Sequence, residues 1–192
     1  AVGAAMTRLR LYHRCLLRHS SAAEARAYLQ QRKLDAAIIE RFGIGFAPPL
    51  PRTLQQWAAR HGYSLEQLVE GGLLAPPRDT RADDYYDRFH GRLMFPLRDA
   101  SGRVVGFSGR ILDPKASPAK YVNSPETPIF HKGRLLYALD LARSNIVRQA
   151  RREALVCEGQ IDVIRCHASG FNTAVAAQGT AFTTDHVQLL KR

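Results

Sequence analysis

Glu158 stands where an apolar run ends and a glycine turn begins, which brings a carboxylate to the end of an expected strand. The run covers residues 155–157, and Gly159 leads into a helical pattern with Asp162 in its first turn. Open α/β sheets bind ligands and ions at the carboxyl ends of their strands. Carboxylate oxygens are ligands that Mg²⁺ prefers, so Glu158 and Asp162 are candidates for a magnesium site.

The same residues also admit a structural role. Many strands end in a polar residue and a glycine because the turn requires them, and an acid in a first helical turn complements the helix dipole. Two acids are too few for a two-metal phosphoryl-transfer centre, so the remaining acids would have to lie beyond Arg192. From these residues alone, both roles stay open.

A polar segment over residues 113–133 contains several prolines and is too long for a simple connection, and loops of this length are usually functional or disordered. It carries Lys120, Tyr121, Asn123 and Lys132. Such residues can hold phosphates and stack on a base. A nucleic-acid or nucleotide site is one interpretation, and a solvated loop shaped by its prolines is the other.

Two arginines are further candidates for phosphate contacts. Arg110 follows Ser108 and Gly109 at the end of an expected strand, where small neighbours would let a phosphate approach. Its alternative role is an edge arginine that extends to solvent. Arg41 precedes the glycines of residues 43–45, and its alternative role is a cation at a helix C-terminus.

The composition favours a phosphate-bearing partner. The chain has 28 Lys and Arg against 17 Asp and Glu, a formal charge of +11, and such an excess drives association with nucleic acid through counterion release. Codon bias towards arginine is the plainer explanation of the same charge. Hydrophobic residues at 45% describe an ordinary globular chain. No apolar stretch predicts a membrane span or a secretory signal.

The three cysteines and the missing motifs exclude several classes. Cys15, Cys157 and Cys166 form no C-x-x-C pair, which argues against a disulfide framework or a structural zinc site and fits a reducing cytoplasm. The phosphate-binding loop of P-loop nucleotidases and the G-x-S-x-G turn of serine hydrolases do not occur.

The first part of the chain is expected to be α+β. Helical patterns cover residues 6–33, 35–41, 53–62, 64–69 and 135–150. Ser20 or Ser21, and Asp35, are placed to cap helices, and Ser64 with Gln67 forms a capping box. A brief strand is expected at residues 43–46. Residues 92–97 and 104–111 flank a turn and predict a β-hairpin.

The second part is expected to be α/β. From residue 153 the pattern becomes strand, helix, a strand at residues 173–177, and a helix from residue 183, which implies a parallel strand pair. A composition break at residues 147–153 predicts the boundary, with domains over residues 1–150 and 151–192.

The order and spacing of these motifs resemble the catalytic core of bacterial DnaG-type replicative DNA primases. The resemblance runs from about residue 20 to residue 192, and the segment over residues 120–133 is close to diagnostic. The matching segments are residues 28–32, 41–49, 86–89, 92–99, 102–110, 120–127, 130–133 and 158–163. The resemblance implies a basic α+β subdomain over residues 1–150 and the first half of a Toprim domain over residues 151–192.

The resemblance also implies part of an RNA polymerase that makes short primers on single-stranded DNA during replication. The family's Toprim glutamate serves a metal-dependent active site, a role that carries over to Glu158 and, less directly, to Asp162. Mg²⁺ or Mn²⁺ is the implied ion, with its further ligands outside this chain. The family's groove for template and nucleoside triphosphates carries over to Arg41, Arg110, Lys120, Tyr121, Asn123 and Lys132.

Two family features are missing from the chain. Its cysteines cannot build the amino-terminal zinc ribbon, so no zinc is expected, and the second acidic motif, Asp-x-Asp, should follow Arg192. The chain alone is therefore not expected to polymerise efficiently. A replicative helicase would bind through other regions, the location would be the cytoplasm at the nucleoid, and no membrane partner is expected.

Two other functions fit parts of the pattern. One is a non-catalytic module that binds single-stranded nucleic acid, in which Glu158 is only a turn residue. The other is a Toprim phosphodiesterase such as a nuclease or topoisomerase, which shares the strand, glutamate, glycine and helix. The segment over residues 120–133 argues against this second alternative.

Overall fold

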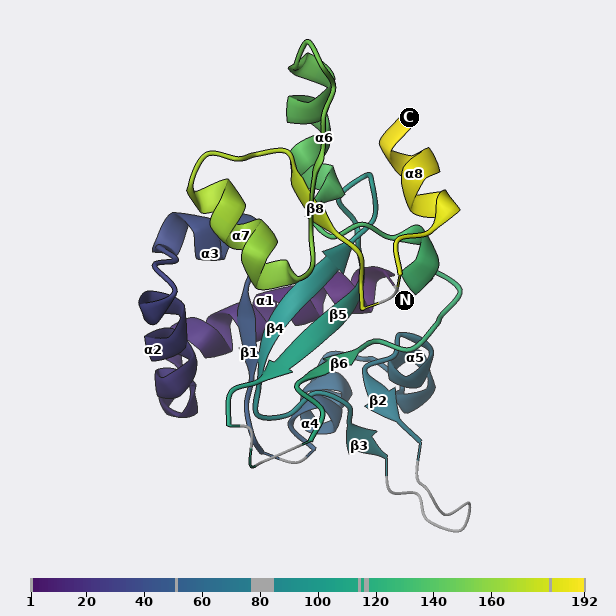
Figure 1. Ribbon diagram of the computed structural model, residues 1–192. Helices are drawn as coiled ribbons and strands as arrows, with labels where there is room; N and C mark the ends of the chain where they lie inside the picture. Colours follow the sequence, from purple (N-terminus) through teal and green to yellow (C-terminus); the bar gives the residue numbers. More distant parts are fainter. Residues whose placement is uncertain are drawn as a thin grey trace.

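A four-stranded antiparallel sheet forms the centre of the molecule (Figure 1). The computed structural model describes residues 2–50, 52–76, 85–113, 115, 118–179 and 181–191. The strand order is β1-β4-β5-β6. The strands are β1 (Gly45–Ala47), β4 (Arg92–Arg98), β5 (Val104–Ile111) and β6 (Tyr121–Asn123).

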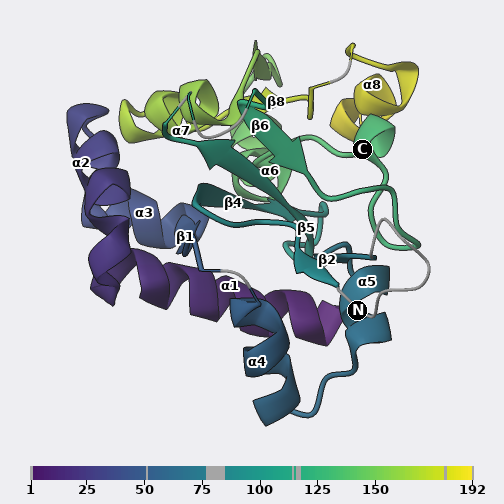
Figure 2. The same ribbon diagram turned by 90° about the horizontal axis from the view of Figure 1, so that it is seen from below.

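The long helix α1 (Val2–Arg18) covers one face of this sheet, and the C-terminal elements lie on the other (Figure 2). Gly45 permits the close approach of α1, because a Cβ at this position would lie 2.6 Å from the backbone carbon of Tyr12. Tyr12 in turn packs edge-on against Phe107 of β5, with ring centroids 5.5 Å apart. The glycine of β1 is therefore a packing requirement of the helix–sheet contact.

The hairpin predicted from residues 92–111 is confirmed. β4 and β5 pair antiparallel from Arg92 opposite Ile111 to Arg98 opposite Val104. The Asp99 carboxylate holds the turn, since its Oδ1 accepts hydrogen bonds from the backbone N–H groups of Ser101 and Arg103, each at 3.0 Å. Local turn chemistry of this kind is readable from sequence.

The helical predictions are confirmed where local caps define them. The Asp35 Oδ1 accepts from the Ile38 N–H at 2.8 Å and begins α3, and Ser64 with Gln67 forms the predicted capping box of α5. The helices of this part are α2 (Ala23–Gln31), α3 (Ala36–Phe42), α4 (Thr53–Arg60), α5 (Leu65–Glu70) and α6 (Leu139–Arg148).

The helical pattern predicted over residues 6–33 corresponds to two helices, α1 and α2. The chain leaves α1 after Arg18 and passes through a 3₁₀ turn, η1 (Ser20–Ala22), before α2 begins. The predicted cap at Ser20 or Ser21 is wrong, because the His19 ring accepts from the Ser21 N–H and Ala22 precedes α2 without a side-chain cap. His19 can take this place because one ring nitrogen of a neutral imidazole accepts hydrogen bonds.

Three strands, β2 (Leu74–Ala75), β3 (Tyr86–Asp87) and β6, were not predicted. β6 lies inside the segment expected to be irregular and pairs with β5, and a short pair joins β2 to β3. The helix expected from residue 135 begins only at Leu139, because the Tyr137 N–H donates to the Ala176 carbonyl at 2.8 Å. Tertiary pairing overrides helical propensity here. Residues 114, 116 and 117 of the segment lie outside the described residues.

The predicted strand–helix–strand–helix run is confirmed. Its strands pair in parallel, with Leu155 opposite Ala174 and Cys157 opposite Ala176. The elements are β7 (Leu155–Cys157), α7 (Gln160–Ala168), β8 (Ala174–Ala176) and α8 (Thr184–Lys191). In the part of the chain that the structure describes, no helix combines the length and apolar character needed to cross a membrane.

One apolar core crosses the predicted boundary near residue 150. Phe42, Phe95 and Tyr137 from the first part belong to the same buried cluster as Ile161 and Val163 of α7. His167 of α7 also meets this cluster, with its ring edge-on to Phe42 at 5.2 Å. The packing fixes how the parallel pair sits on the antiparallel sheet, because close-packed cores resist displacement.

His167 is held in its neutral form at this contact. Its Nε2 lies 2.9 Å from the Ala174 carbonyl, and its buried Nδ1 has no hydrogen-bond partner among the described residues. Burial lowers the pKa of His167 below its ordinary value, the positive charge of Arg41 lowers it further, and the bond to Ala174 opposes the shift. Protonation would place an unpaired N–H inside the core.

We therefore expect the free energy of unfolding to fall as the pH drops through about 6.5, the ordinary value for histidine. The unfolded chain takes up a proton there while folded His167 resists it, so stability is full above this pH and lost below it. The free energy of unfolding, measured in urea at about pH 7 and pH 5, should fall less between these two pH values for His167→Gln than for the parent protein. Equal slopes in the two proteins would contradict the assignment.

Candidate functional site

Glu158 and Asp162 are both exposed at the turn between β7 and α7, which we call the acid turn (residues 158–162). The Asp162 carboxylate folds back over this turn, since its Oδ2 lies 3.6 Å from the position of a Cβ added to Gly159. The structure thus places the two predicted acids at the carboxyl end of one strand, where α/β sheets bind their ligands.

The donor set of the acid turn fits part of a magnesium shell. Mg²⁺ takes carboxylate oxygens and keeps several waters, and Glu158 and Asp162 offer two solvent-exposed carboxylates. Over the described residues, no group of three or more His, Cys, Asp or Glu side chains is placed to hold a metal ion. The acid turn therefore fits one part of a site to which other carboxylates or waters would contribute.

Cys157 lies directly before the acid turn and is poorly suited to act as a nucleophile. Burial raises the pKa of its thiol to about 11, aided by the Cys166 thiol and the negative charge of Asp162. The two sulfur atoms are 3.9 Å apart. Since the thiolate is the reactive form, this thiol is largely unreactive at neutral pH.

A buried amide contact joins the acid turn to the antiparallel sheet. The Gln160 Nε2 donates to the Gln178 Oε1 at 2.7 Å, and these side chains belong to residues only 7% and 1% exposed. The Asn123 Nδ2 of β6 donates to the Gln178 backbone carbonyl at 3.5 Å. We call these three residues the amide bridge. Gln178 therefore lies between Gln160 of the acid turn and Asn123, which was predicted to line the groove.

Arg110 and Tyr121 form the centre of the basic surface. They are direct cross-strand partners of β5 and β6, and the Arg110 Nη1 donates to the Tyr121 Oη at 2.7 Å. The guanidinium carbon also lies 5.3 Å from the centroid of the Tyr121 ring. The structure therefore brings these two predicted residues together and holds Arg110 in place.

The small size of Gly109 has a packing reason. A Cβ at this position would lie 2.9 Å from Phe89 and 3.0 Å from the Arg92 side chain. Because successive residues of a strand point to opposite faces, Gly109 faces away from Arg110. Its smallness therefore serves the packing of β5 and not the approach of a phosphate to Arg110.

The segment that carries Lys132 is ordered by its own hydrogen bonds. Glu126 accepts from the Lys132 backbone N–H at 3.0 Å and bonds the His131 ring at 2.9 Å, and these two partners hold the pKa of Glu126 below its ordinary value. Buried Ser124 exchanges bonds with the backbone of Phe107. This segment is not a solvated loop, which favours the functional interpretation.

The remaining two predicted residues lie at separate places. Lys120 is exposed next to β6, where its carbonyl accepts from the Ile111 N–H. Arg41 is exposed at the end of α3, and its Nη1 donates to the Asn172 Oδ1 at 3.2 Å. Arg41 is thus tied to the loop between α7 and β8.

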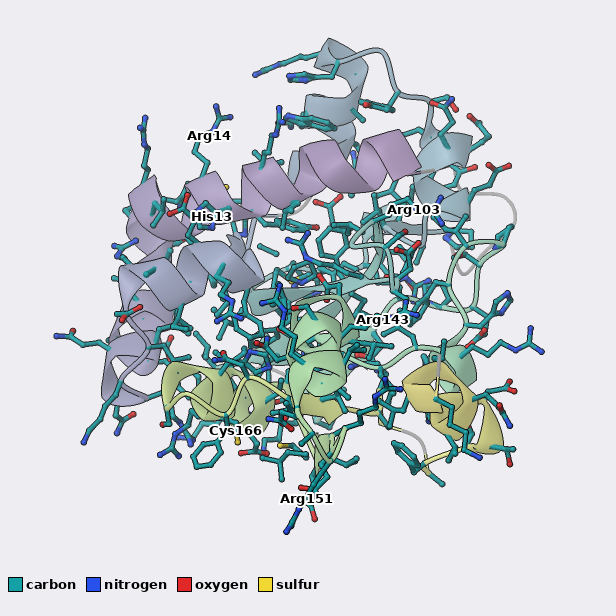
Figure 3. The ribbon with its side chains drawn as sticks, turned by 90° about the horizontal axis from the view of Figure 1, so that it is seen from above. His13, Arg14, Arg103, Arg143, Arg151 and Cys166 are labelled. Carbon is teal, nitrogen blue, oxygen red and sulfur yellow. The ribbon has the colours of Figure 1, made fainter. Side chains whose placement is uncertain are left out.

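A second group of arginines surrounds a cavity of about 400 Å³ between the β4–β5 turn, α6 and α8. Arg103 and Arg143 lie on this side of the molecule (Figure 3). Arg103 pairs with Asp99 at 2.8 Å and Arg134 pairs with Asp185 at 2.9 Å, while Arg98 lies 3.9 Å from Asp140. Acids already compensate most of these cations, so this cavity is a weaker phosphate site than the surface around Arg110.

Sequence reasoning missed the partners that hold the site together. Tyr28 lies with its ring 5.2 Å from the Arg110 guanidinium carbon, and Gln160 and Gln178 join Asn123 in the amide bridge. Gln178 stands between an apolar strand and Gly179, the same pattern that drew attention to Glu158. Tyr28 carried no comparable signal, because its contact depends on tertiary structure.

The architecture defines a class: a mixed α/β protein with a basic antiparallel sheet followed by the parallel start of a second domain. Comparison with known families is consistent with this class. Residues 12–143 match the family described as the DNA primase catalytic core, N-terminal domain, and residues 152–192 match the Toprim domain. The chain belongs to the family of DNA primase catalytic cores, which confirms both the predicted resemblance and the predicted fold class.

Individual relatives agree with this assignment. The chain is 49% identical over 166 residues to the DNA primase of Deinococcus radiodurans, covering 86% of this chain and 28% of that protein. The RNA polymerase domain of Mycobacterium tuberculosis primase DnaG, solved with a double-stranded DNA oligomer bearing a 6-nucleotide overhang, is 39% identical with a TM-score of 0.91. This match covers 100% of the chain and 58% of that domain.

A third relative was solved with single-stranded DNA. It is a DnaG primase catalytic domain that is 41% identical with a TM-score of 0.84, and the match covers 98% of this chain and 56% of that domain. The chain thus spans less than a third of the Deinococcus primase and more than half of the solved domains.

Proposed function

We propose that this chain forms part of a DNA primase, a nucleotidyltransferase that makes short RNA primers on single-stranded DNA during replication. The observation that carries the proposal is the amide bridge, which ties the acid turn to the strand that bears Tyr121 and Asn123. The family membership and the relatives solved with DNA support it.

The template strand binds along the surface around Arg110. Arg110 and Lys120 make no ion pair with an acid in the described ranges, so their charges are available for phosphates. Lys132 adds a third cation, whose charge also helps to lower the pKa of nearby Glu126. The Tyr121 ring offers a face to a base, and Asn123 offers amide groups to a sugar, phosphate or base. Arg41 would extend this surface towards α7. Nucleoside triphosphates bind the same positive surface through their phosphates.

The acid turn serves the chemical step. Glu158, with Asp162, would hold Mg²⁺ or Mn²⁺, which when bound neutralises charge that develops on phosphoryl oxygens. The reaction joins a primer 3′-hydroxyl to the α-phosphate of a nucleotide and releases pyrophosphate. Arg110 and Lys132 orient the phosphates by charge and direction. The other carboxylates and the helicase contacts would come from regions outside residues 1–192, and the intact protein would act in the cytoplasm at the nucleoid.

A non-catalytic module that binds single strands is the second candidate. The observation that favours it is the sparse acid turn, with two exposed carboxylates and no larger ligand group among the described residues. In that case Glu158 only ends β7 and Asp162 only complements the dipole of α7. A Toprim phosphodiesterase has less support, because residues 12–143 match a primase family.

Replacing Glu158 separates the two candidates. In the intact protein, Glu158→Gln is expected to lower Mg²⁺-dependent primer synthesis by about 100-fold or more, the typical effect of losing a group that stabilises transition-state charge. Binding of single-stranded DNA should change by less than about twofold, since an exposed carboxylate that leaves the basic surface intact contributes little to binding. Synthesis is measured by incorporation of labelled ribonucleotides on a single-stranded template.

The matched control is Glu153→Gln, which removes another exposed carboxylate just before β7. This variant should retain full synthesis. Unchanged synthesis by Glu158→Gln would show that the glutamate is only a turn residue, and the absence of Mg²⁺-dependent synthesis by the parent protein would favour the non-catalytic candidate.

The basic surface is tested by its salt dependence. Combining Arg110→Ala and Lys132→Ala should weaken binding of a single-stranded oligonucleotide and flatten the plot of log affinity against log salt by roughly one to two units, because fewer counterions are released. Fluorescence anisotropy over a salt series measures both quantities. The expected slope change follows from the loss of two phosphate contacts.

Arg151→Ala combined with Arg60→Ala is the control for total charge. Arg151 extends from the turn between α6 and β7 (Figure 3), and Arg60 is exposed at the end of α4. This pair should leave the slope within about half a unit of the parent. Equal slopes for both double variants would remove Arg110 and Lys132 from the binding surface.

A further inference from the structure

We propose that Tyr28 is a positioning residue for single-strand binding, whose ring holds the guanidinium groups of Arg110 and Arg32 towards template phosphates. The inference deepens the proposed function and rests on it. It concerns three elements that lie far apart in sequence, with Tyr28 on α2, Arg110 on β5 and Tyr121 on β6. Figures 1 and 2 show α2 on the side of the sheet towards which β5 runs.

The Arg110 guanidinium contacts two aromatic rings. Its carbon lies 5.2 Å from the centroid of Tyr28 and 5.3 Å from that of Tyr121. A cation within about 6 Å of a ring face is attracted by the ring's quadrupole. Tyr121 adds a hydrogen bond to Nη1, whereas Tyr28 is joined to Arg110 through its ring alone. The two rings thus restrict the long side chain to few rotamers.

The Tyr28 hydroxyl does not explain this arrangement. Its oxygen is buried and has no hydrogen-bond partner among the described residues. A buried hydroxyl without a partner costs stability, so the hydroxyl itself gives no reason for a tyrosine here. The useful part of the side chain is the aromatic face, which phenylalanine would also supply.

Arg32 places a second cation on the same ring. Its guanidinium carbon lies 5.2 Å from the Tyr28 centroid, and it follows the last turn of α2 as the C-cap residue. Neither Arg32 nor Arg110 forms an ion pair with an acid within the described part of the chain. Two uncompensated cations on one ring favour an anion between or beside them, and a nucleic-acid phosphate supplies that charge.

Ordering these arginines before binding raises affinity. A free arginine loses rotamer freedom when it binds a phosphate, and a side chain already held in place loses less. Tyr28 needs no contact with DNA for this effect. Its removal should therefore weaken binding more where Arg110 is present than where it is absent, which a purely structural role would not require.

The test compares variants of Tyr28 in the presence and absence of Arg110. Anisotropy with a single-stranded oligonucleotide should show roughly three- to tenfold weaker binding for Tyr28→Leu, within the range of one lost cation–π contact. Tyr28→Phe should bind within about twofold of the parent, because it keeps the ring face. When Arg110 is already replaced by alanine, Tyr28→Leu should change the log affinity by less than about half of the change that it causes in the parent protein.

Three results would overturn the inference: parent-like binding by Tyr28→Leu, Tyr28→Phe as weak as Tyr28→Leu, or an unchanged effect without Arg110. If Tyr28→Leu does not fold by circular dichroism, pentafluorophenylalanine at position 28 keeps the shape and reverses the ring's charge distribution. The variant with this residue should bind the oligonucleotide as weakly as is expected for Tyr28→Leu, and binding as tight as that of the parent would overturn the inference. Failure of the proposed function is distinguishable, since Arg110→Ala itself would then leave binding unchanged.

Discussion

The buried hydrogen bond between Gln160 and Gln178 is the constraint on which the arrangement of the site depends. Gln160 lies two residues after Glu158, and Gln178 lies two residues after the end of β8. The Asn123 side chain reaches the same Gln178 from the other sheet. Buried amides are expensive to leave unpaired and few positions satisfy them, so such contacts specify geometry. The acid turn therefore has a defined place relative to the strand that bears Tyr121.

Charge compensation separates the two basic regions of the molecule. Around the cavity beside α6, Arg103 and Arg134 already face acids, and their charges serve the packing of turn and helix. Around Arg110, the neighbours are aromatic rings, which hold a cation without neutralising it. A net charge of +11 does not show which arginines bind phosphate. Their partners do.

Sequence reasoning predicted the parts of the fold that local chemistry defines. The hairpin, the Asp35 cap, the Ser64 capping box and the parallel unit all follow from short patterns. It failed where distant residues decide, as in β6, and where an unusual cap such as His19 replaced a common one. The candidate residues were found by type and motif, but their partners Tyr28 and Gln178 become visible only after folding.

The most direct measurement is a double-mutant cycle on the amide bridge, read as the free energy of urea unfolding. Gln160→Leu and Gln178→Leu each leave one buried amide unpaired, so each should destabilise the protein by about 1–3 kcal/mol. The double variant replaces both amides by apolar groups and should recover at least about 1 kcal/mol relative to the sum. If the two changes in the free energy of unfolding simply add, the account is contradicted. The two glutamines would then not be coupled, and their contact would not fix the acid turn relative to the antiparallel sheet.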